Sequence, residues 1–422
     1  MIAPFKEKED FTAYENKLVF TRIQGIPMSF YLEGNTLIQA DIAKLDEEGR
    51  ECGILNNIYI GKIRNIAKNL NAAFVEYKPG AIGFLSLETK REPYLLNRVY
   101  NGGLSQGDEL LVQVEKEPVK TKDAVLTTNL TFSGTYGVLS TECRKTGFSN
   151  KLSKKQKEFL KSALDMGPFG NRTEEFGLIF RTNAGNLTEE TIHLLWEEIE
   201  NLEQKKKALL EKAKTRQPFT LLYQEKPFAV KKAQDTYFTH INRIITDEED
   251  IYRQLLDTEL SEKVSFYQDE LLPLQNLYGL KGKLEEALKK KVWLKSGGYL
   301  VIEPTEALTV IDVNSGKCTD KKKRQEMHVK VNKEAAMEAA RQIRLRNLSG
   351  IILVDFINLE EKAKEEELIS FFREQCRKDP VPTTLVDITP LGLVELTRKK
   401  IAAPLHEKCR GLFTESENRS EP

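Results

Sequence analysis

The chain has 422 residues, of which 40% are hydrophobic, 8% aromatic and 30% charged, which is enough apolar material for a sizeable core and excludes an intrinsically disordered protein. Lys+Arg and Asp+Glu both number 64, so the formal net charge is zero. Any binding of nucleic acid must therefore depend on local basic patches and not on the field of the whole molecule.

Short β-rich runs separated by Gly, Pro or Asn turns dominate residues 54–118. Four such runs in succession predict a small antiparallel barrel. Two earlier strand-like runs, 17–23 and 36–40, have no obvious partner nearby, so we expect them to pair with strands later in the chain. The four runs of the predicted barrel are 57–64, 71–77, 83–87 and 107–114.

The next part of the chain mixes strand and helix patterns up to Pro218, where a boundary is expected. Charged, helix-like periodicity predicts helices over 153–166 and 189–216. The second helix has plausible caps at 186–188 and a Lys205–Lys207 run that is typical of a solvated face.

The pattern after residue 298 predicts a βαβ unit. Because a crossover of this kind is almost always right-handed and joins parallel strands, its two strands should end at the same edge of the sheet. Asp312 and Asp355 each lie near that end. The predicted strands are 299–302, 308–313 and 350–355, and the helix is 325–346.

These two carboxylates lie inside otherwise apolar strands, where an unpaired charge is costly. Ligands bind at the carboxyl ends of strands in open α/β sheets. Asp312 and Asp355, with the neighbouring amide of Asn314, are hard ligands that suit Mg²⁺. On the residues alone the alternative stays open that each Asp caps a helix or pairs with an arginine.

Two further patterns suit RNA. The helix between the carboxylates has basic residues at spacings of three and four, which can hold a phosphate backbone or can simply be solvated. The predicted barrel interleaves aromatic and basic residues, which suits base stacking, with core packing as the alternative. The helix residues are Lys330, Lys333, Met337, Arg341 and Arg344, and the barrel residues are Tyr59, Lys62, Arg64, Phe74 and Phe84.

Other kinds of site are excluded by their spacing. The run 314–317 lacks the first Gly and the final Ser/Thr of a phosphate-binding P-loop, and the four histidines fall in no metal or triad motif.

No stretch is long and apolar enough for a membrane span, and residues 1–10 do not resemble a secretory signal, so we expect a cytoplasmic protein without a membrane partner. The five cysteines contain no C-x-x-C and should be reduced thiols; they are Cys52, Cys143, Cys318, Cys376 and Cys409.

Three long motifs together resemble the catalytic region of the ribonuclease E/G family. They are TEALTVIDVNS at 305–315, AARQIRLR at 339–346 with GIILVDFI at 350–357, and GLVELTR at 392–398. Shorter matches at 57–87, 126–128 and 179–182 extend the resemblance over most of the chain, from about residue 17 to 409.

This resemblance implies an α/β (α+β) multidomain protein. The expected parts are an RNase H-like domain split between 1–52 and 217–284, an OB-fold RNA-binding barrel at 53–118, and a 5′-sensor domain at 119–216. A DNase I-like catalytic domain at 285–404 and a C-terminal tail at 405–422, polar and disordered from residue 414, complete the expectation.

The family consists of Mg²⁺-dependent, single-strand-specific endoribonucleases of bacterial RNA processing and decay, so the resemblance implies rRNA precursors and mRNA as substrates. By position, Asp312 and Asp355 match the metal-binding aspartates and Asn314 the supporting amide, with Mg²⁺ or Mn²⁺ as cofactor. The remaining matches are Phe74, Phe84 and Lys122 for holding RNA, and Gly134, Val138, Arg181 and Thr182 for sensing a 5′ monophosphate; we add Arg341 and Arg344 of the basic helix face as RNA contacts.

Two departures from the family pattern affect assembly and binding. The family links protomers through zinc held by a C-x-x-C pair, whereas this chain has Cys409-Arg-Gly-Leu412, so zinc is not expected and we expect a monomer or a weak zinc-independent dimer. Pro390 also lies near the position of a basic residue that precedes Gly-Leu-Val-Glu in the family, which puts one RNA contact in doubt.

We therefore expect a hydrolase in which Mg²⁺ at Asp312 and Asp355 activates water for in-line attack on a phosphodiester, leaving a 5′ phosphate and a 3′ hydroxyl. The alternative is a non-catalytic RNA-binding protein of the same family. Retention of both aspartates and Asn314 favours the enzyme.

Overall fold

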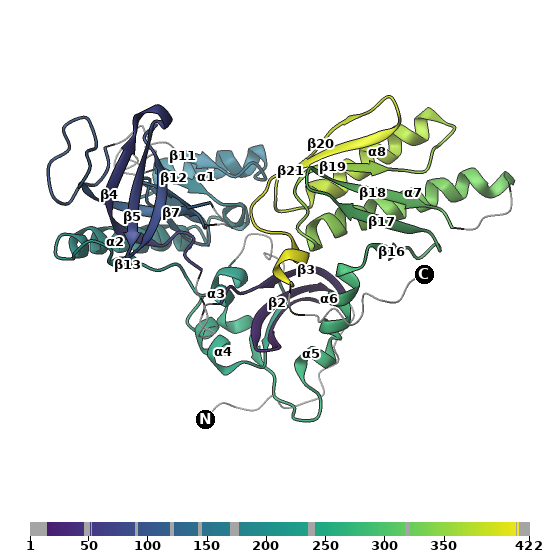
Figure 1. Cartoon of the computed structure of the whole chain (residues 1–422). Helices are drawn as coiled ribbons and strands as arrows, with labels where there is room; N and C mark the ends of the chain where they lie inside the picture. The colour runs from purple at the N-terminus through teal and green to yellow at the C-terminus, as the bar shows by residue number, and fades with distance from the viewer. Residues whose placement is uncertain are drawn as a thin grey trace. The chain divides into compact units, whose positions relative to one another are not determined.

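The structure is a computed structural model, drawn in Figure 1, and it describes residues 15–45, 51, 53–88, 92–118, 122–141, 146–168, 177–234, 241–316, 321–410 and 412. The chain divides into two compact units. One consists of Met1–Ala43 with His240–Pro422, and the other of Lys44–Thr239. The predictions for residues 1–10 and 414–422, and for Cys52, Cys143 and Cys318, lie outside the described residues.

The first unit contains a five-stranded sheet in the order β15-β14-β1-β2-β3. β1 pairs in parallel with β14, Val19 lying opposite Ile245, which confirms that the early strands pair with a later segment. Gln24 and Gly25 both have positive φ (51° and 80°) and form the two-residue turn between β1 and β2. The strands are β1 (Asn16–Ile23), β2 (Ile26–Glu33), β3 (Thr36–Ile42), β14 (Arg243–Thr246) and β15 (Val264–Phe266).

Short helices add their apolar residues to one core with this sheet. Leu405, Cys409 and Leu412 belong to that buried cluster, so the first residues of the predicted C-terminal tail pack against this core. The helical elements of this part are α4 (Glu249–Leu256), η4 (Ser261–Lys263), α5 (Leu274–Leu277), α6 (Leu280–Leu288) and α9 (Leu405–Lys408).

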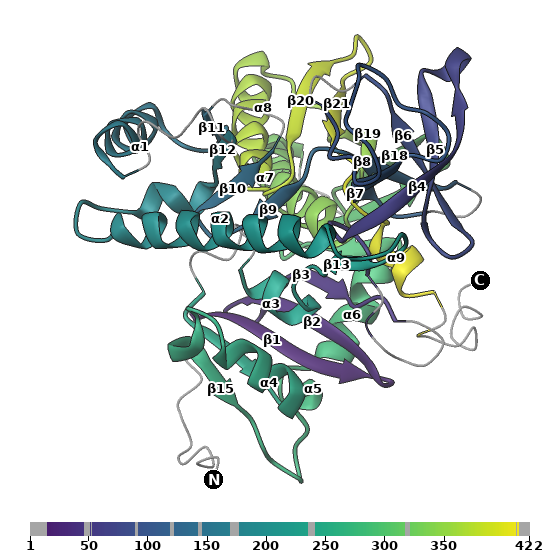
Figure 2. The ribbon, with the colours of Figure 1, turned by 90° about the vertical axis from the view of Figure 1, so that its left-hand side faces the viewer.

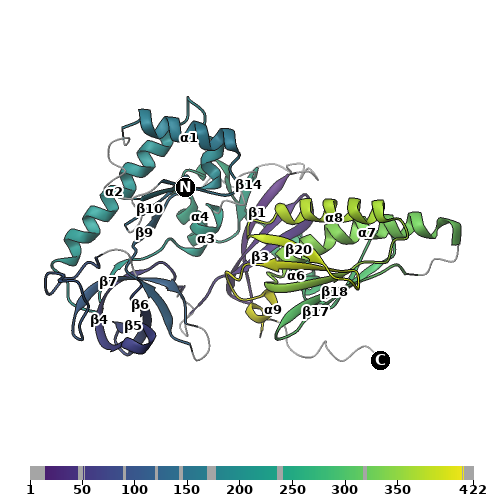
Figure 3. The same ribbon diagram turned by 90° about the horizontal axis from the view of Figure 1, so that it is seen from above.

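The second sheet of this unit has six strands in the order β16-β17-β18-β19-β21-β20. β18 and β19 are parallel, as the βαβ pattern predicts, and the other neighbours are antiparallel. The helices α7 (Lys321–Leu345) and α8 (Lys362–Arg377) cover one face, as Figure 3 shows from above. The strands are β16 (Lys291–Trp293), β17 (Tyr299–Pro304), β18 (Leu308–Asn314), β19 (Gly350–Asp355), β20 (Thr383–Ile388) and β21 (Leu393–Arg398).

Strict alternation along these strands separates a buried face from an open one. Ile311 and Val313 of β18 and Ile352 and Val354 of β19 pack with the alanine-rich side of α7, whereas the residues between them remain half-buried or exposed. The carboxylates at 312 and 355 therefore stand on the open face, where water still reaches them.

The second unit contains a closed five-stranded barrel, because β4 pairs with both β5 and β7. This closure is consistent with the OB fold that the resemblance implies. The predicted antiparallel barrel of four runs lacked β8, which pairs in parallel with β6 and lies beyond the expected end of the barrel at residue 118. The strands are β4 (Ile58–Ala67), β5 (Ala72–Lys78), β6 (Ala81–Ser86), β7 (Glu109–Lys116) and β8 (Ala124–Thr127), with η1 (Lys68–Leu70) after β4.

A four-stranded sheet in the order β11-β12-β10-β9 packs against α2 in the same unit, and Figure 2 shows α2 running beside β9 and β10. α1 begins with a capping box at Ser153 and Gln156, as its sequence favours. α2 begins later than predicted, because residues 189–192 form turns; its N-cap is Ile192, so the 186–188 segment provides no cap. The elements are β9 (Thr131–Ser133), β10 (Gly137–Ser140), β11 (Thr146–Phe148), β12 (Gly177–Phe180), α1 (Lys154–Met166), η2 (Thr182–Asn186) and α2 (His193–Ala213).

The boundary expected at residue 217 differs from the arrangement of the strands. β13 (Leu221–Tyr223) pairs with β4 of the barrel, and the unit continues through α3 (Phe228–Ala233) to Thr239. A strand of three residues is too short for its sequence to indicate which strand it pairs with. Among the described residues, no helix is both long enough and apolar enough to cross a membrane.

Candidate functional site

The two acidic residues singled out in the βαβ unit lie directly opposite each other. Asp312 of β18 is the register partner of Asp355, the last residue of β19. Strands in a sheet are about 4.8 Å apart, and in-register residues share a face, so both carboxylates project from the open face as neighbours. The predicted juxtaposition at one sheet position is therefore present.

The amide of Asn314 supports this pair, since its Nδ2 donates a hydrogen bond of 2.8 Å to Oδ2 of Asp312. Partial burial of the carboxyl, and then the nearby charge of Asp312, raise the pKa of Asp355 above its usual value. The alternative role of pairing with an arginine is not seen, because among the described residues neither Asp312 nor Asp355 makes an ion pair with an arginine, and the N-cap of α8 is Glu361.

A buried asparagine that sequence reasoning missed holds the backbone just after Asp355. Asn332 of α7 is fully buried; its Nδ2 donates to the Ile357 carbonyl oxygen (2.7 Å) and its Oδ1 accepts from the Ile357 amide (3.1 Å). A polar residue on the otherwise apolar side of the helix was the one available signal. Asn332 thus fixes the segment that ends β19.

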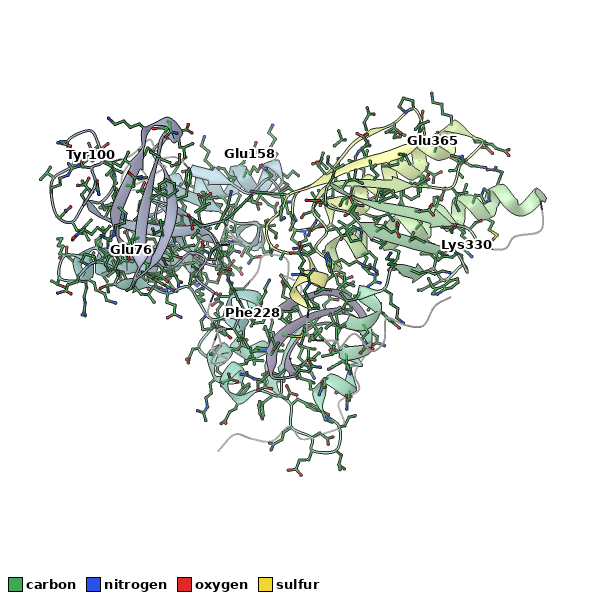
Figure 4. The ribbon with its side chains drawn as sticks, in the orientation of Figure 1. Glu76, Tyr100, Glu158, Phe228, Lys330 and Glu365 are labelled. Carbon is green, nitrogen blue, oxygen red and sulfur yellow. The ribbon has the colours of Figure 1, made fainter. Side chains whose placement is uncertain are left out.

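The basic side of α7 does not lie beside the carboxylates, contrary to the expectation from the sequence. α7 packs on the buried face of the sheet, and Figure 4 labels Lys330 of α7 and Glu365 of α8 on the two helices that cover it. Lys333 pairs with Glu367 of α8 at 2.7 Å. A crossover helix must cover the sheet with its apolar side, so its polar side points away from the opposite face.

The two arginines predicted to contact RNA are also used within the fold. Arg341 pairs with Glu338 and donates from Nη1 to the Leu37 carbonyl oxygen of β3, which ties α7 to the first sheet. Arg344 lies half-buried near Tyr31, whose pKa burial raises to about 12 while the Arg344 charge lowers it. Arg341 therefore has a role in joining α7 to the first sheet, and RNA contact by Arg341 and Arg344 stays a prediction.

Two of the barrel aromatics lie outside its core. Phe74 of β5 and Phe84 of β6 are register partners, half-buried, with ring centroids 6.2 Å apart in an edge-to-face arrangement. The buried cluster of the barrel contains their sequence neighbours Ala73, Val75 and Leu85 instead. Core packing is therefore excluded for this pair, and Lys122 is exposed just before β8, the neighbour of β6.

The other barrel residues of the predicted stacking surface have structural roles. Tyr59 is 1% exposed and belongs to the barrel core. Lys62 pairs with Glu109 at 3.4 Å, and Arg64 pairs with Glu76. Successive residues of a strand point to opposite sides, so only alternate positions of the barrel strands can hold aromatic residues that face outward.

The residues predicted to sense a 5′ monophosphate gather at one end of the four-stranded sheet. Arg181 follows β12, and its Nη1 donates to the carbonyl oxygen of Gly134, which follows β9. Val138 of β10 lies opposite Ile179, and the hydroxyls of Thr182 and Ser149 are 2.9 Å apart. The four positions are close in space although they are separated by over forty residues of sequence.

The carboxylate of Glu198 from α2 organises this loop and was not found from the sequence. It accepts hydrogen bonds from the backbone amides of Thr135, Tyr136 (2.8 Å) and Gly137 (2.9 Å). A Cβ at Gly134 would lie 2.3 Å from Glu198, so the loop closes on the carboxylate only with glycine there. One acidic residue within a charged helix carries no distinguishing pattern.

The donor set on the open face fits a hard divalent ion. Mg²⁺ commonly uses one or two protein carboxylates and keeps several waters, and the half-exposed pair Asp312 and Asp355 leaves room for them. Within the described ranges no group of three or more His, Cys, Asp or Glu residues is close enough together to hold a metal ion. Pro390 is exposed in the turn before Leu393, the residue opposite Asp355.

Comparison with known proteins agrees with these features. The model of the ribonuclease E/G family matches residues 131–401. Ribonuclease E of Nostoc sp. (strain PCC 7120) is 34% identical over 368 residues, covering 84% of this chain and 52% of that protein. Ribonuclease G of Salmonella typhimurium is 31% identical over 387 residues (88% of this chain, 77% of that protein), and ribonuclease E of Escherichia coli K12 is 32% identical over 414 (92% and 38%).

The chain thus spans about half the length, or less, of these ribonuclease E relatives. The match to the family model covers the four-stranded sheet and both acidic strands. From the extent of the family match and the identity to ribonuclease G, the chain belongs to the ribonuclease E/G family.

Proposed function

We propose that this protein is an endoribonuclease that hydrolyses single-stranded RNA in a Mg²⁺-dependent reaction. The observation that carries the proposal is the pair Asp312 and Asp355, in register on adjacent parallel strands of an open sheet face. The names of its relatives, ribonuclease E and ribonuclease G, support the reaction class.

The chain's own residues position the reacting groups. Asp312 and Asp355 would hold Mg²⁺, or Mn²⁺ in its place, and Asn314 keeps the Asp312 carboxylate oriented. When bound, the ion supplies an acidified water and neutralises the charge that develops on the phosphate. Hydrolysis in this sense leaves a 5′ phosphate and a 3′ hydroxyl.

The barrel and the four-stranded sheet would bind other parts of the substrate. Phe74 and Phe84 offer outward aromatic faces for bases, and the exposed Lys122 offers a cation for a phosphate. The Arg181 and Thr182 end of the sheet, with Gly134 and Val138, is the proposed site for a 5′ monophosphate. Such a specificity suits rRNA maturation and mRNA turnover.

The two sheets of the first unit are proposed as the RNase H-like and DNase I-like parts of the family. β1 to β3 precede the second unit and β14 and β15 follow it, which supports an RNase H-like sheet split by an insertion. The carboxylates lie on the later, six-stranded sheet, which supports its catalytic assignment.

We also propose that assembly is independent of zinc. The Cys409 thiol is buried in the first core, and burial raises its pKa to about 11. Zinc binds the thiolate, so a buried, protonated thiol is a poor ligand. Zinc analysis together with light scattering, with and without a chelator, tests this; a dimer that needs stoichiometric zinc contradicts it.

The test of the activity uses a labelled, 5′-monophosphorylated single-stranded RNA with and without Mg²⁺. Asp312→Asn and Asp355→Asn should each abolish cleavage, whereas RNA affinity measured by fluorescence anisotropy stays close to that of the parent. Glu303→Gln, an exposed acid on the same sheet face, is the matched control and should cleave normally. A parent protein that binds this RNA but never cuts it would favour the non-catalytic alternative.

A further inference from the structure

An aromatic pair with a lysine between its rings lies at one edge of the six-stranded sheet. Trp293 of β16 and Tyr299 of β17 are register partners with ring centroids 5.3 Å apart and planes at 62°. The Lys291 Nζ lies 4.2 Å from the Trp293 centroid and 3.9 Å from that of Tyr299. The tryptophan is 65% exposed.

The strand registers place this cluster on the same face as the carboxylates. One row across the sheet runs Lys291, Val301, Asp312 and Asp355, and the neighbouring row runs Trp293, Tyr299 and Asn314. In-register residues share a face, so the two rings and the ammonium project from the open side. Two strand spacings, about 10 Å, separate the backbone of β16 from that of β18.

An exposed tryptophan at this position is unusual for a residue that only supports the fold. Large aromatics contribute most when buried, yet Trp293 projects away from the core formed by α7 and α8. In the described part of the chain no carboxylate pairs with Lys291, whose recorded contacts are the two rings. A lysine on an edge strand also discourages sheet-to-sheet pairing, but that role does not require aromatic neighbours.

The chemistry of the three side chains matches a nucleotide. Flat aromatic faces stack on bases whatever the sequence, and a nearby ammonium attracts the phosphate backbone. The carboxylates two strands away repel a bare phosphate until a cation neutralises them, whereas Lys291 attracts it directly. An RNA strand that lies across the two rows would therefore place one nucleotide on the aromatic rings and another at the acidic pair.

We propose that Trp293, Tyr299 and Lys291 form a stacking site for one base of the single-stranded RNA, beside the phosphate positioned at Asp312 and Asp355. This inference rests on the proposed nuclease function, because it assigns a second contact to the same substrate. The site recognises the π-face of a base and not its edges, so it fixes the position of the strand with little sequence preference.

The experiment measures binding in an Asp355→Asn background, which keeps the RNA intact. Trp293→Ala should weaken the affinity for a short single-stranded RNA by roughly 5- to 150-fold, the range for loss of one stacked base. Trp293→Phe should retain most of the affinity, and Lys291→Gln should reduce its dependence on salt. Val386→Ala removes an exposed apolar side chain from the opposite edge strand and should change nothing.

Two readouts report the stack itself. The chain has two tryptophans, so in a Trp196→Phe variant RNA should quench the remaining fluorescence of Trp293. An abasic nucleotide placed at successive positions should lower the affinity at one position in the Asp355→Asn protein, and the same position should be silent once Trp293→Ala is added. A coupling of this kind requires contact between that base and that ring.

The outcomes separate this inference from the proposed function. If the parent cleaves RNA but Trp293→Ala binds every RNA as tightly and no quenching occurs, the stacking site is wrong and the nuclease assignment stands. If RNA quenches Trp293 and the abasic position is found, yet the parent never cleaves, the site stands and the nuclease assignment is wrong. A change in oligomeric state with unchanged RNA affinity assigns the edge to self-association and overturns the inference.

Discussion

Replacement of Asn332 by leucine tests how the position of Asp355 is maintained. The side chain is fully buried and makes two hydrogen bonds to one residue, Ile357, at 2.7 Å and 3.1 Å. Leucine has a similar volume and no polar atoms, so Asn332→Leu removes both bonds without opening a large cavity. The Ile357 amide and carbonyl then lose their partner.

The magnitude follows from the two orphaned backbone groups. Each buried group left without a partner costs about 1–3 kcal/mol. Because Ile357 is only half-buried and water reaches part of it, we expect a loss of roughly 2–4 kcal/mol in the free energy of unfolding. Groups that orient metal ligands commonly change activity by about 10- to 100-fold, and we expect cleavage to fall within that range.

Urea unfolding of the protein without RNA, and single-turnover cleavage with the protein in saturating excess over RNA, measure the two effects. Lys333→Ala, one residue along α7, removes an exposed ion pair with Glu367 and is the matched control, with little effect on either. A variant that is destabilised but cleaves at the parental rate would refute the reasoning, because the clamp would then support the fold and not Asp355.

Three further predictions concern other buried or clustered groups. Burial raises the pKa of Asp247, so the native state binds its proton more tightly than the unfolded chain does. The free energy of unfolding should therefore fall as the pH rises from 3.8 through the higher native pKa. Asp247→Asn should flatten this pH dependence in urea titrations at several pH values. Arg398→Met should destabilise by about 3–5 kcal/mol, since it leaves the buried Asp379 carboxylate without its partner at 2.8 Å, and adding Asp379→Asn should recover much of the loss in thermal unfolding. Glu198→Gln should loosen the 134–137 loop and reduce the preference for 5′-monophosphorylated over 5′-hydroxyl RNA, while rates on the latter stay constant.

The elements with strong periodic signals could be predicted from the sequence. The apolar runs around Asp312 and Asp355 are joined by a long helix, and such a crossover almost always joins parallel strands. The parallel pairing of β18 with β19 follows from this rule. The same reasoning placed both carboxylates near the same edge of the sheet, and their in-register pairing is a finding of the structure. The charged, helix-like pattern over 153–166 likewise predicted α1.

Elements whose partners lie far away in the chain could not be predicted. β8 and β13 are four and three residues long, and their pairing with β6 and β4 depends on barrel closure and not on their own residues. The position of the basic side of α7 relative to the carboxylates was also misjudged, because the alanine side of α7 packs on one face of the sheet and the carboxylates stand on the other. Tyr59 lies in the barrel core and Phe74 outside it, and the sequence does not distinguish them, since alternation alone does not say which residues of a strand face inward.

The open face of the six-stranded sheet explains why the acidic pair is tolerated there. Helices α7 and α8 cover the apolar residues Ile311 and Val313 of β18 and Ile352 and Val354 of β19, while the carboxylates alternate onto the side that stays hydrated. Had the strands slipped by one residue, both charges would enter the core at a cost of several kcal/mol each, on the order expected for unpaired buried ions. The strand register that keeps both charges out of the core is therefore also the register that brings the two carboxylates together. The same register places Lys291 and Trp293 on the open face, although the stability of the core does not require them there. Residues on that face are free to serve the substrate, because the core is complete without them.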